Sequence, residues 1–200
     1  MGSKVTTVGL TGSIASGKST VSKMFVEMGA HLIDYDLLAR DVVRPHKDAW
    51  NAIIEAFGTQ ILNDDLTLNR DKLARVVFSD PDRLQVLNSV THPAVFREAE
   101  RQANEIARAD PNGIIIKDVP LLIETGIHRT VDKVVVVWAS RENRIQRLIM
   151  RGLTQEEALR RIDSQMPLRE KVEYADFVIR NDGSLAETRK QVEEIYEALQ

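Results

Sequence analysis

A glycine-rich segment near the N-terminus limits the folds that this chain can adopt. It reads Gly12-Ser13-Ile14-Ala15-Ser16-Gly17-Lys18-Ser19. This is the Walker A spacing, and it lies between an apolar run typical of a strand at 5–10 and a helical run at 18–28. Strand, loop and helix in this order surround a phosphate with backbone N–H groups and the positive end of a helix dipole. A glycine turn before a helix cap is the alternative, but the agreement of motif and context favours phosphate binding.

The residues of this loop predict where a nucleotide and its metal ion bind. Lys18 is expected to contact the β and γ phosphates and to assist transfer, and Ser19 to offer its hydroxyl to Mg²⁺. ATP and Mg²⁺ are therefore the expected cofactors. The loop residues assigned to the nucleotide are Gly12, Ser13, Ile14, Ala15, Ser16, Gly17, Lys18 and Ser19.

Apolar runs along the chain predict a mostly parallel five-stranded sheet. Three runs rich in β-branched residues have the composition of buried strands, and two shorter runs are suitable neighbours. They span 5–10, 114–119 and 134–138, and 30–33 and 177–179. Helical patterns separate the runs, so right-handed crossovers should cover both faces of the sheet with helices. The sequence therefore predicts the α/β class with three layers, α/β/α.

The length of 200 residues suits a single domain, 1–200, whose sheet core carries two helical segments. We expect the core to comprise 1–36, 113–140 and 172–200, a helical insertion to cover about 37–112, and a second helical segment to cover about 141–171. Capping-box spacing marks helix starts at Thr154 with Glu157 and at Ser184 with Glu187, and Pro81 marks another. The insertion is suited to covering an acceptor molecule.

Composition excludes several classes of protein. The chain has no cysteine, which excludes disulfides and thiolate metal sites. A net charge of −3 and a pI near 5.9 argue against a general nucleic-acid binder. No apolar run approaches the length of a membrane span, and the N-terminus lacks the pattern of a secretory signal. We therefore expect a cytoplasmic monomer or small homo-oligomer that acts on a small molecule and binds neither nucleic acid nor membrane.

Acidic residues that follow predicted strands are candidates for catalysis and metal binding. Asp34 and Asp36 come after a short strand, at the sheet edge that also carries the loop. A carboxylate there can accept the proton of an acceptor hydroxyl, but aspartate is equally favoured as the cap of a helical run at 37–43, so both roles stay open for Asp36. Asp118 ends another strand and could steady Mg²⁺, with Glu124 nearby, although solvated charge at a strand end is an equal alternative.

His92-Pro93 marks a further helix start in the sequence. Proline is favoured at the first position of a helix, so a helical run is expected to open here. A histidine at such a place is more often a cap or a packed side chain than a catalytic group.

Arginines gather on one side of the predicted helix that follows residue 140. Arg141, Arg144, Arg147 and Arg151 fall within one broad face at helical spacing. Beside a phosphate-binding loop, such a face can close over ATP as a lid and neutralise the transferring phosphoryl group. A solvated face with ion pairs such as Glu142 with Arg147 is the alternative.

Together these motifs resemble dephospho-coenzyme A kinase, a family of P-loop kinases. The match covers almost the whole chain and depends on motifs in a fixed order. They are Gly9-Leu10-Thr11-Gly12, Ser16-Gly17-Lys18-Ser19-Thr20, Ile33-Asp34-Tyr35-Asp36 with Ala39-Arg40, His92-Pro93, Val119-Pro120-Leu121-Leu122 with Glu124, Arg147 and Arg151, Gln165, and Ala175-Asp176 leading to Asn181. The loop alone is common to many families, whereas this ordered set is specific.

The resemblance implies an activity and several residue roles. In this family ATP phosphorylates the ribose 3′-hydroxyl of dephospho-coenzyme A, which gives coenzyme A and ADP. Asp36 matches the catalytic carboxylate, Thr20 extends the nucleotide loop, and Arg147 and Arg151 match lid positions near ATP. The positions assigned to the acceptor are Asp36, Arg40 and His92.

The sequence departs from the common family pattern at a few positions. Ser13 and Ala15 replace loop glycines, and a left-handed backbone at either position would cost more than with glycine. Tyr35 stands where alanine is common, Ile123 where phenylalanine is common, and Arg144 where glutamine is common. These changes concern acceptor fit and lid contact and leave the implied reaction unchanged.

Two alternatives to this activity stay open at the level of sequence. Another small-molecule P-loop kinase, such as one for a nucleoside monophosphate or a sugar-like alcohol, would share the loop. A switch or assembly protein that binds ATP without phosphorylating a metabolite would share it too. The order of Asp36, His92-Pro93 and 119–122 favours the coenzyme A precursor.

Overall fold

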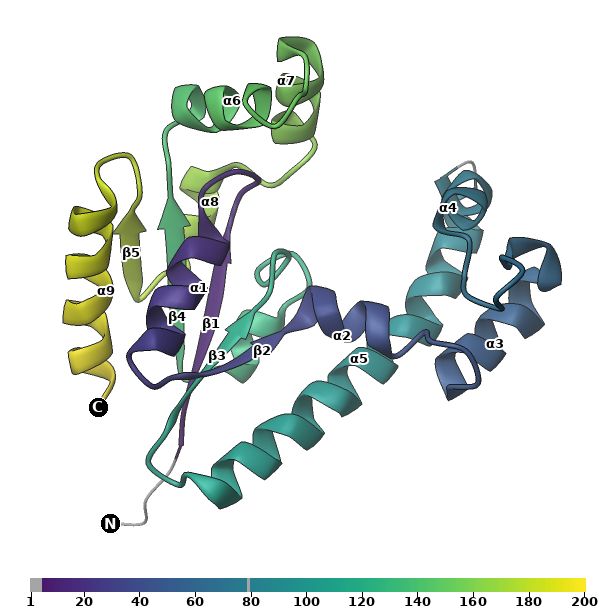
Figure 1. Ribbon diagram of the computed structural model, residues 1–200, viewed down its shortest axis with the longest axis horizontal. Helices are drawn as coiled ribbons and strands as arrows, with labels where there is room; N and C mark the ends of the chain where they lie inside the picture. Colours follow the sequence, from purple (N-terminus) through teal and green to yellow (C-terminus); the bar gives the residue numbers. More distant parts are fainter. Residues whose placement is uncertain (1–4, 79) are drawn as a thin grey trace. The chain divides into compact units, whose positions relative to one another are not determined.

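The computed structural model describes residues 5–78 and 80–200 (Figure 1). The first four residues of the predicted core therefore lie outside the described part. The chain forms two compact units, one made of Met1–Ile33 and Glu105–Gln200 and the other of Asp34–Asn104. Each unit is described by itself below.

A five-stranded sheet forms the centre of the first unit. The strands are β1 (Thr6–Gly12), β2 (His31–Asp34), β3 (Ile114–Asp118), β4 (Lys133–Trp138) and β5 (Phe177–Arg180), and their order is β2-β3-β1-β4-β5. The pairs β1 with β3, β1 with β4, and β4 with β5 are parallel. All five predicted strands are confirmed, and with them the α/β fold class.

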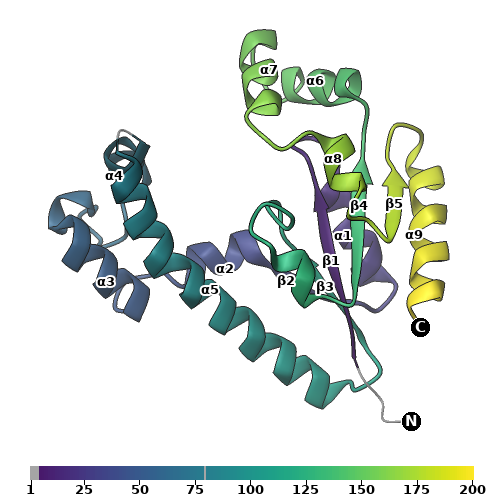
Figure 2. The ribbon, with the colours of Figure 1, turned by 180° about the vertical axis from the view of Figure 1, so that it is seen from behind.

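The central strands are buried because their runs are apolar on both faces. Val8 and Leu10 of β1, like Ile116 of β3, are fully buried. On one face they pack against α1 (Lys18–Glu27) and α9 (Leu185–Leu199). Figures 1 and 2 show these two helices on one side of the sheet and α8 (Leu168–Val172) on the other, over β4. In open α/β sheets ligands bind at the carboxyl ends of the strands, and the loop after β1 lies at these ends.

Between β4 and β5 the chain forms a helical hairpin and then α8. The hairpin consists of α6 (Arg141–Ile149) and α7 (Gln155–Asp163), and a short 3₁₀ turn, η2 (Ile127–Thr130), precedes β4. Both predicted capping boxes are formed, at Thr154 with Glu157 before α7 and at Ser184 with Glu187 before α9. In each box the side chain of the cap residue accepts from the third helical amide, which satisfies a donor that a helix end leaves unpaired.

The regular elements among the described residues of the second unit are helices, apart from one isolated bridge between Leu62 and Leu68. Its elements are α2 (Tyr35–Asp41), α3 (Asp48–Phe57), η1 (Thr59–Ile61), α4 (Arg70–Phe78) and the long α5 (Pro81–Ala109), whose last residues belong to the first unit. Ile53, Phe57 and Leu73 form the centre of its apolar core.

The predicted helix start at His92-Pro93 is wrong, because both residues lie inside α5, which begins at Pro81 as predicted. Pro93 lacks the N–H that would bond to the carbonyl of the preceding turn, a defect worth about 3 kcal/mol in a helix interior. Leu87 and Val90 before the proline pack against the apolar core of the second unit, and Val95 and Ala99 after it are buried, so packing on both sides of the proline offsets that cost. No helix among residues 5–78 and 80–200 is long and apolar enough to span a membrane.

Candidate functional site

The glycine-rich loop connects β1 to α1 and is shaped by residues near the end of the chain. Gly17 has φ +94°, and a Cβ atom there would overlap the side-chain nitrogen of Asn181. That nitrogen donates to the carbonyl oxygen of Ser16 at 2.8 Å. Only glycine satisfies both the left-handed backbone and the close approach of Asn181.

The loop offers donors to an anion. The amide of Ser16 donates to the carbonyl of Ser13 within the loop. In contrast, the amides of Gly17, Lys18 and Ser19 have no acceptor among the described residues. They lie at the N-terminus of α1, where the helix dipole also favours negative charge. The chemistry of this donor set fits a nucleotide phosphate.

Lys18, the first residue of α1, forms an ion pair with Asp118, the last residue of β3. The ammonium of Lys18 donates to the carboxylate of Asp118, which is almost completely buried. The parallel register places Leu10 of β1 opposite Asp118, and this brings the start of α1 to the end of β3. The pair joins a cation and a carboxylate where phosphates would bind.

Magnesium would need oxygen ligands beyond those that the chain supplies. The described residues contain no group of three or more histidine or acidic side chains arranged to hold a metal ion. Ser19 is exposed in the first turn of α1, and Asp118 is the carboxylate beside Lys18. These side chains fit a Mg²⁺ ion whose remaining ligands are phosphate oxygens and water.

In the second unit the cap of α2 is Asp34, so the alternative interpretation of Asp36 as the helix cap is wrong. The Asp34 carboxylate accepts from the amides of Asp36 and Leu37 at 2.9 and 3.0 Å. The helix begins at Tyr35, two residues earlier than the sequence pattern indicated, and the cap position moves with it. Asp36 is left with an exposed carboxylate in the first turn.

Other predicted acceptor residues also lie in the second unit. Arg40 is exposed in the last turn of α2. His92 is exposed in α5, with its ring centroid 6.3 Å from that of Phe96, and is therefore not a cap. Burial raises the pKa of Tyr35 to about 12, with a further contribution from Glu100, so its hydroxyl stays protonated at neutral pH.

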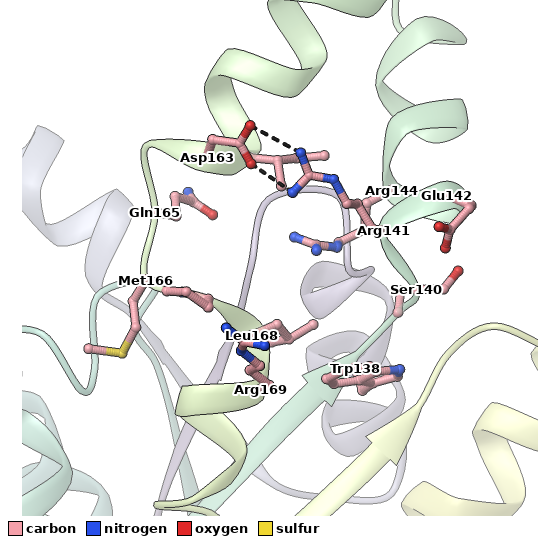
Figure 3. Close-up of a pocket in the computed structure, with 13 residues that line it drawn as sticks. Trp138, Ser140, Arg141, Glu142, Arg144, Asp163, Gln165, Met166, Leu168 and Arg169 are labelled. Carbon is pink, nitrogen blue, oxygen red and sulfur yellow. Dashed lines mark hydrogen bonds and ion pairs between the residues drawn. The ribbon is translucent and has the colours of Figure 1, made fainter.

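The four arginines after residue 140 have different surroundings. Arg141 forms a bidentate pair with Asp163, as the dashed lines in Figure 3 show. Arg147 donates to the carbonyls of Ala15 and Ser16, both at 3.1 Å, and to that of Asn181 at 2.5 Å. The alternative ion pair of Glu142 with Arg147 is therefore wrong, because the guanidinium is bound to loop carbonyls. Arg151 is exposed beyond the end of α6.

Arg144 and Gln165 contact the loop directly. Nη1 of Arg144 donates to Oγ of Ser13 at 2.7 Å, and Oγ donates to Oε1 of Gln165 at 2.8 Å. Both side chains line a pocket of about 520 Å³ between the base of the hairpin and α8 (Figure 3). The sequence placed Arg144 on the cationic face of a lid and Gln165 among the family motifs, but it predicted neither contact with the loop, because partners more than 130 positions away in the chain leave no signal in local spacing.

Glu124 binds a buried lysine. Nζ of Lys171 lies 2.8 Å from Oε1 of Glu124 and donates to the carbonyl of Pro120 at 2.9 Å. The hydroxyl of Thr11 donates to the same carbonyl at 3.0 Å. Lys171 thus ties α8 to the turn that follows β3, a role that its sequence context did not indicate.

Comparisons with known proteins agree on one family. The family model described as dephospho-CoA kinase matches residues 6–187. A dephospho-CoA kinase of Bacillus cereus (strain ATCC 10987 / NRS 248) is 46% identical over 189 residues, which are 94% of this chain and 94% of that protein. A Thermus thermophilus crystal structure titled TT1252 is 33% identical with a TM-score of 0.84, and the match covers 98% of this chain and 99% of that one.

A solved dephospho-CoA kinase from Campylobacter jejuni is similar as well. It is 26% identical with a TM-score of 0.73, and the match covers 96% of both chains. The relatives match this chain over nearly their whole length, so the agreement is not limited to the widespread nucleotide loop. The chain belongs to the dephospho-CoA kinase family.

Proposed function

We propose that the protein transfers the γ-phosphoryl group of ATP, bound with Mg²⁺, to the ribose 3′-hydroxyl of dephospho-coenzyme A. The reaction gives coenzyme A and ADP and is the last step of coenzyme A synthesis. The observation that carries the proposal is the loop around Gly17, with unpaired amides at the start of α1 followed by Lys18, in a chain of this family.

The nucleotide is assigned to the first unit. The amides of Gly17 to Ser19 bind phosphate oxygens, and Lys18 exchanges its bond with Asp118 for the β and γ phosphates. Ser19 and Asp118 would hold Mg²⁺, which supplies positive charge to the oxygens of the transferring group. The remaining nucleotide residues are those of the loop from Gly12 to Thr20 together with Arg147 and Arg151.

The acceptor is assigned to residues of the second unit. Asp36 accepts the proton of the attacking hydroxyl, and Arg40 and His92 bind the acceptor. Because Asp34 provides the helix cap, the carboxylate of Asp36 is left for this task. We keep the further predictions of one kinase domain with an acceptor-binding insertion at about 37–112 and a lid at about 141–171, in a cytoplasmic monomer or small homo-oligomer.

Substrate choice is tested by following ADP release with four acceptors. Dephospho-coenzyme A should stimulate release in the presence of Mg²⁺ and ATP, whereas AMP, CMP and shikimate should not. Stimulation by only one of the last three would overturn the assignment of the acceptor. Tight ATP binding with no stimulation by any acceptor would favour a nucleotide-dependent switch.

The residue roles are tested with two variants and a matched control. Asp36→Asn should lower kcat about a hundredfold or more and largely spare ATP binding, because a positioned base is lost. Lys18→Ala should lower kcat and should also weaken ATP binding. Asp71→Asn is the control, since Asp71 is also an exposed second residue of a helix, α4, and should leave turnover unchanged. Turnover of Asp36→Asn equal to that of the control would remove Asp36 from the mechanism.

A further inference from the structure

We propose that Arg144 is a positioning residue that acts through Ser13 to hold the nucleotide loop in its phosphate-binding shape. The proposal rests on the proposed function, because the loop is taken to bind ATP. We refer to the group formed by Arg144, Ser13 and Gln165 as the loop node. The node joins three parts of the first unit: the loop, the start of α6, and the segment between α7 and α8.

The contacts of the node fix two consecutive loop residues. Oγ of Ser13 accepts from Nη1 of Arg144 at 2.7 Å and donates to Oε1 of Gln165 at 2.8 Å. The same Oε1 accepts from the amide of Ile14 at 2.8 Å. Ser13 and Arg144 are only 6% and 7% exposed, so water does not replace these bonds easily. Loop residues 13 and 14 are therefore held by side chains, and the amides of Gly17, Lys18 and Ser19, which have no acceptor among the described residues, are left for phosphate.

The surroundings of Arg144 limit what this side chain can contribute to fold stability. Burial, and secondly the charge of Arg141, lowers the pKa of its guanidinium. Its Nε atom is buried and has no hydrogen-bond partner within residues 5–78 and 80–200, and the bidentate carboxylate of Asp163 is bound to Arg141 instead. A buried cation that donates to a neutral hydroxyl contributes less to stability than a paired one. Its defined effect is on the loop that it contacts.

Apolar contacts reinforce the same connection. Ala15 of the loop is buried in a cluster with Leu148, Ala158 and Ile162 of the hairpin, and Ile14 packs against this cluster. A loop supported on both its polar and apolar sides loses less conformational freedom when ATP binds. Loss of the node should therefore weaken ATP binding more than it slows transfer.

A double-mutant cycle tests whether Arg144 acts through Ser13. The variants are Arg144→Met, Ser13→Ala and the double variant, with KM for MgATP, kcat, and the Kd for MgADP from calorimetry as readouts. Each single change should raise KM and Kd about tenfold, the loss expected for one hydrogen bond to a charged group. The double variant should be no weaker than the single ones, and kcat should stay within about twofold.

The control is Arg160→Met, which removes an exposed arginine of the same hairpin that pairs with Glu156. It should leave KM and Kd unchanged. If the effects of the two single changes multiply in the double variant, Arg144 acts by its charge and the proposal fails. It also fails if Ser13→Ala leaves Kd within twofold of the unchanged protein.

A replacement variant and a binding constant that does not depend on the acceptor allow the proposal to be tested in every case. If Arg144→Met does not fold, Arg144→Lys takes its place in the cycle, and Ser13→Ala removes only one oxygen atom. The Kd for MgADP is independent of the acceptor, so the node is tested even if dephospho-coenzyme A is not phosphorylated. Lack of ADP release by the unchanged protein with this acceptor would contradict the proposed function and leave the binding test in place.

Discussion

Ala15 occupies a backbone conformation that usually requires glycine. Its φ is +61°, which costs an L-residue about 1–2 kcal/mol. The methyl group is buried against Leu148 and Ala158, and burial of one such carbon returns about 0.8 kcal/mol. Ser13, the other replaced glycine, does not have a positive φ. The expected cost of replacing loop glycines thus arises at one position only, where packing offsets part of it.

Gly17 provides a test of the loop at the scale of one residue. Gly17→Ala should destabilise the fold by about 2 kcal/mol or more and weaken MgADP binding, because it adds backbone strain and displaces Asn181. Urea unfolding and calorimetry measure the two effects. Gly152→Ala is the matched control, since Gly152 has φ +91° and no described residue other than its chain neighbours has an atom within 4 Å of the added Cβ. Equal losses for the two variants would show that Asn181 is not involved.

Residue roles were predictable where they depend on local chemistry. Both capping boxes follow from spacing alone. The cap of α2 could not be assigned in this way, because it depends on where β2 stops, and an aspartate stands at each of two candidate positions. The loop contacts of Arg144, Gln165 and Asn181 are long-range, so only the folded chain reveals them.

Among the elements, α5 shows that a proline in the sequence does not always mark the start of a helix. Pro81 begins the helix as expected, whereas Pro93 lies within it. The same residue type therefore marks a helix start in one place and a tolerated defect in another, depending on whether apolar packing continues beyond it. The strands were easier to predict, because runs of β-branched residues such as Val134 to Val137 are buried on both faces.

The carboxylate of Glu98 in α5 makes the free energy of unfolding depend on pH. Hydrogen bonds from Arg101 and Gln102 lower the pKa of Glu98 to about 2. The ionised carboxylate of Glu98 therefore stabilises the folded protein at pH values above its ordinary pKa of about 4.3, and this stabilisation is lost as the pH falls toward 2. Glu98→Gln should lower the free energy of unfolding by about 0.5 kcal/mol at pH 7, since the pair is partly exposed, and by less at pH 3.

Urea unfolding at both pH values measures this difference. Glu100→Gln, which removes an exposed carboxylate of the same helix, is the control and should change the unfolding free energy by less at pH 7. A Glu98→Gln effect that grows as the pH falls would have the wrong sign and would contradict the assignment.

At the scale of the whole molecule, the sheet brings distant segments together around one loop. β1 lies between β3 and β4, so the loop after β1 meets Asp118 on one side and the hairpin on the other. Alternation of strands and helices was sufficient to predict the fold class. It could not predict the strand order or the contacts of the hairpin, which depend on packing.

This arrangement predicts that nucleotide binding slows hydrogen exchange in segments that are far apart in the sequence. With Mg²⁺ and a non-hydrolysable ATP analogue, hydrogen exchange should slow in the loop, in α6 and around Asn181 together, because Arg147 joins these segments. Mass spectrometry of peptides measures the exchange, and Lys18→Ala should abolish the effect. Slowing confined to the loop would show that the three segments are not coupled.

The contact between Gly17 and Asn181 also has a consequence for protein synthesis. A ribosome releases the loop motif early, long before it adds the residues that shape it. An incomplete chain would contain the whole glycine-rich motif and would still lack the residues that shape the loop. We therefore expect ATP to bind more weakly to a chain that stops before Asn181 than to the 200-residue chain.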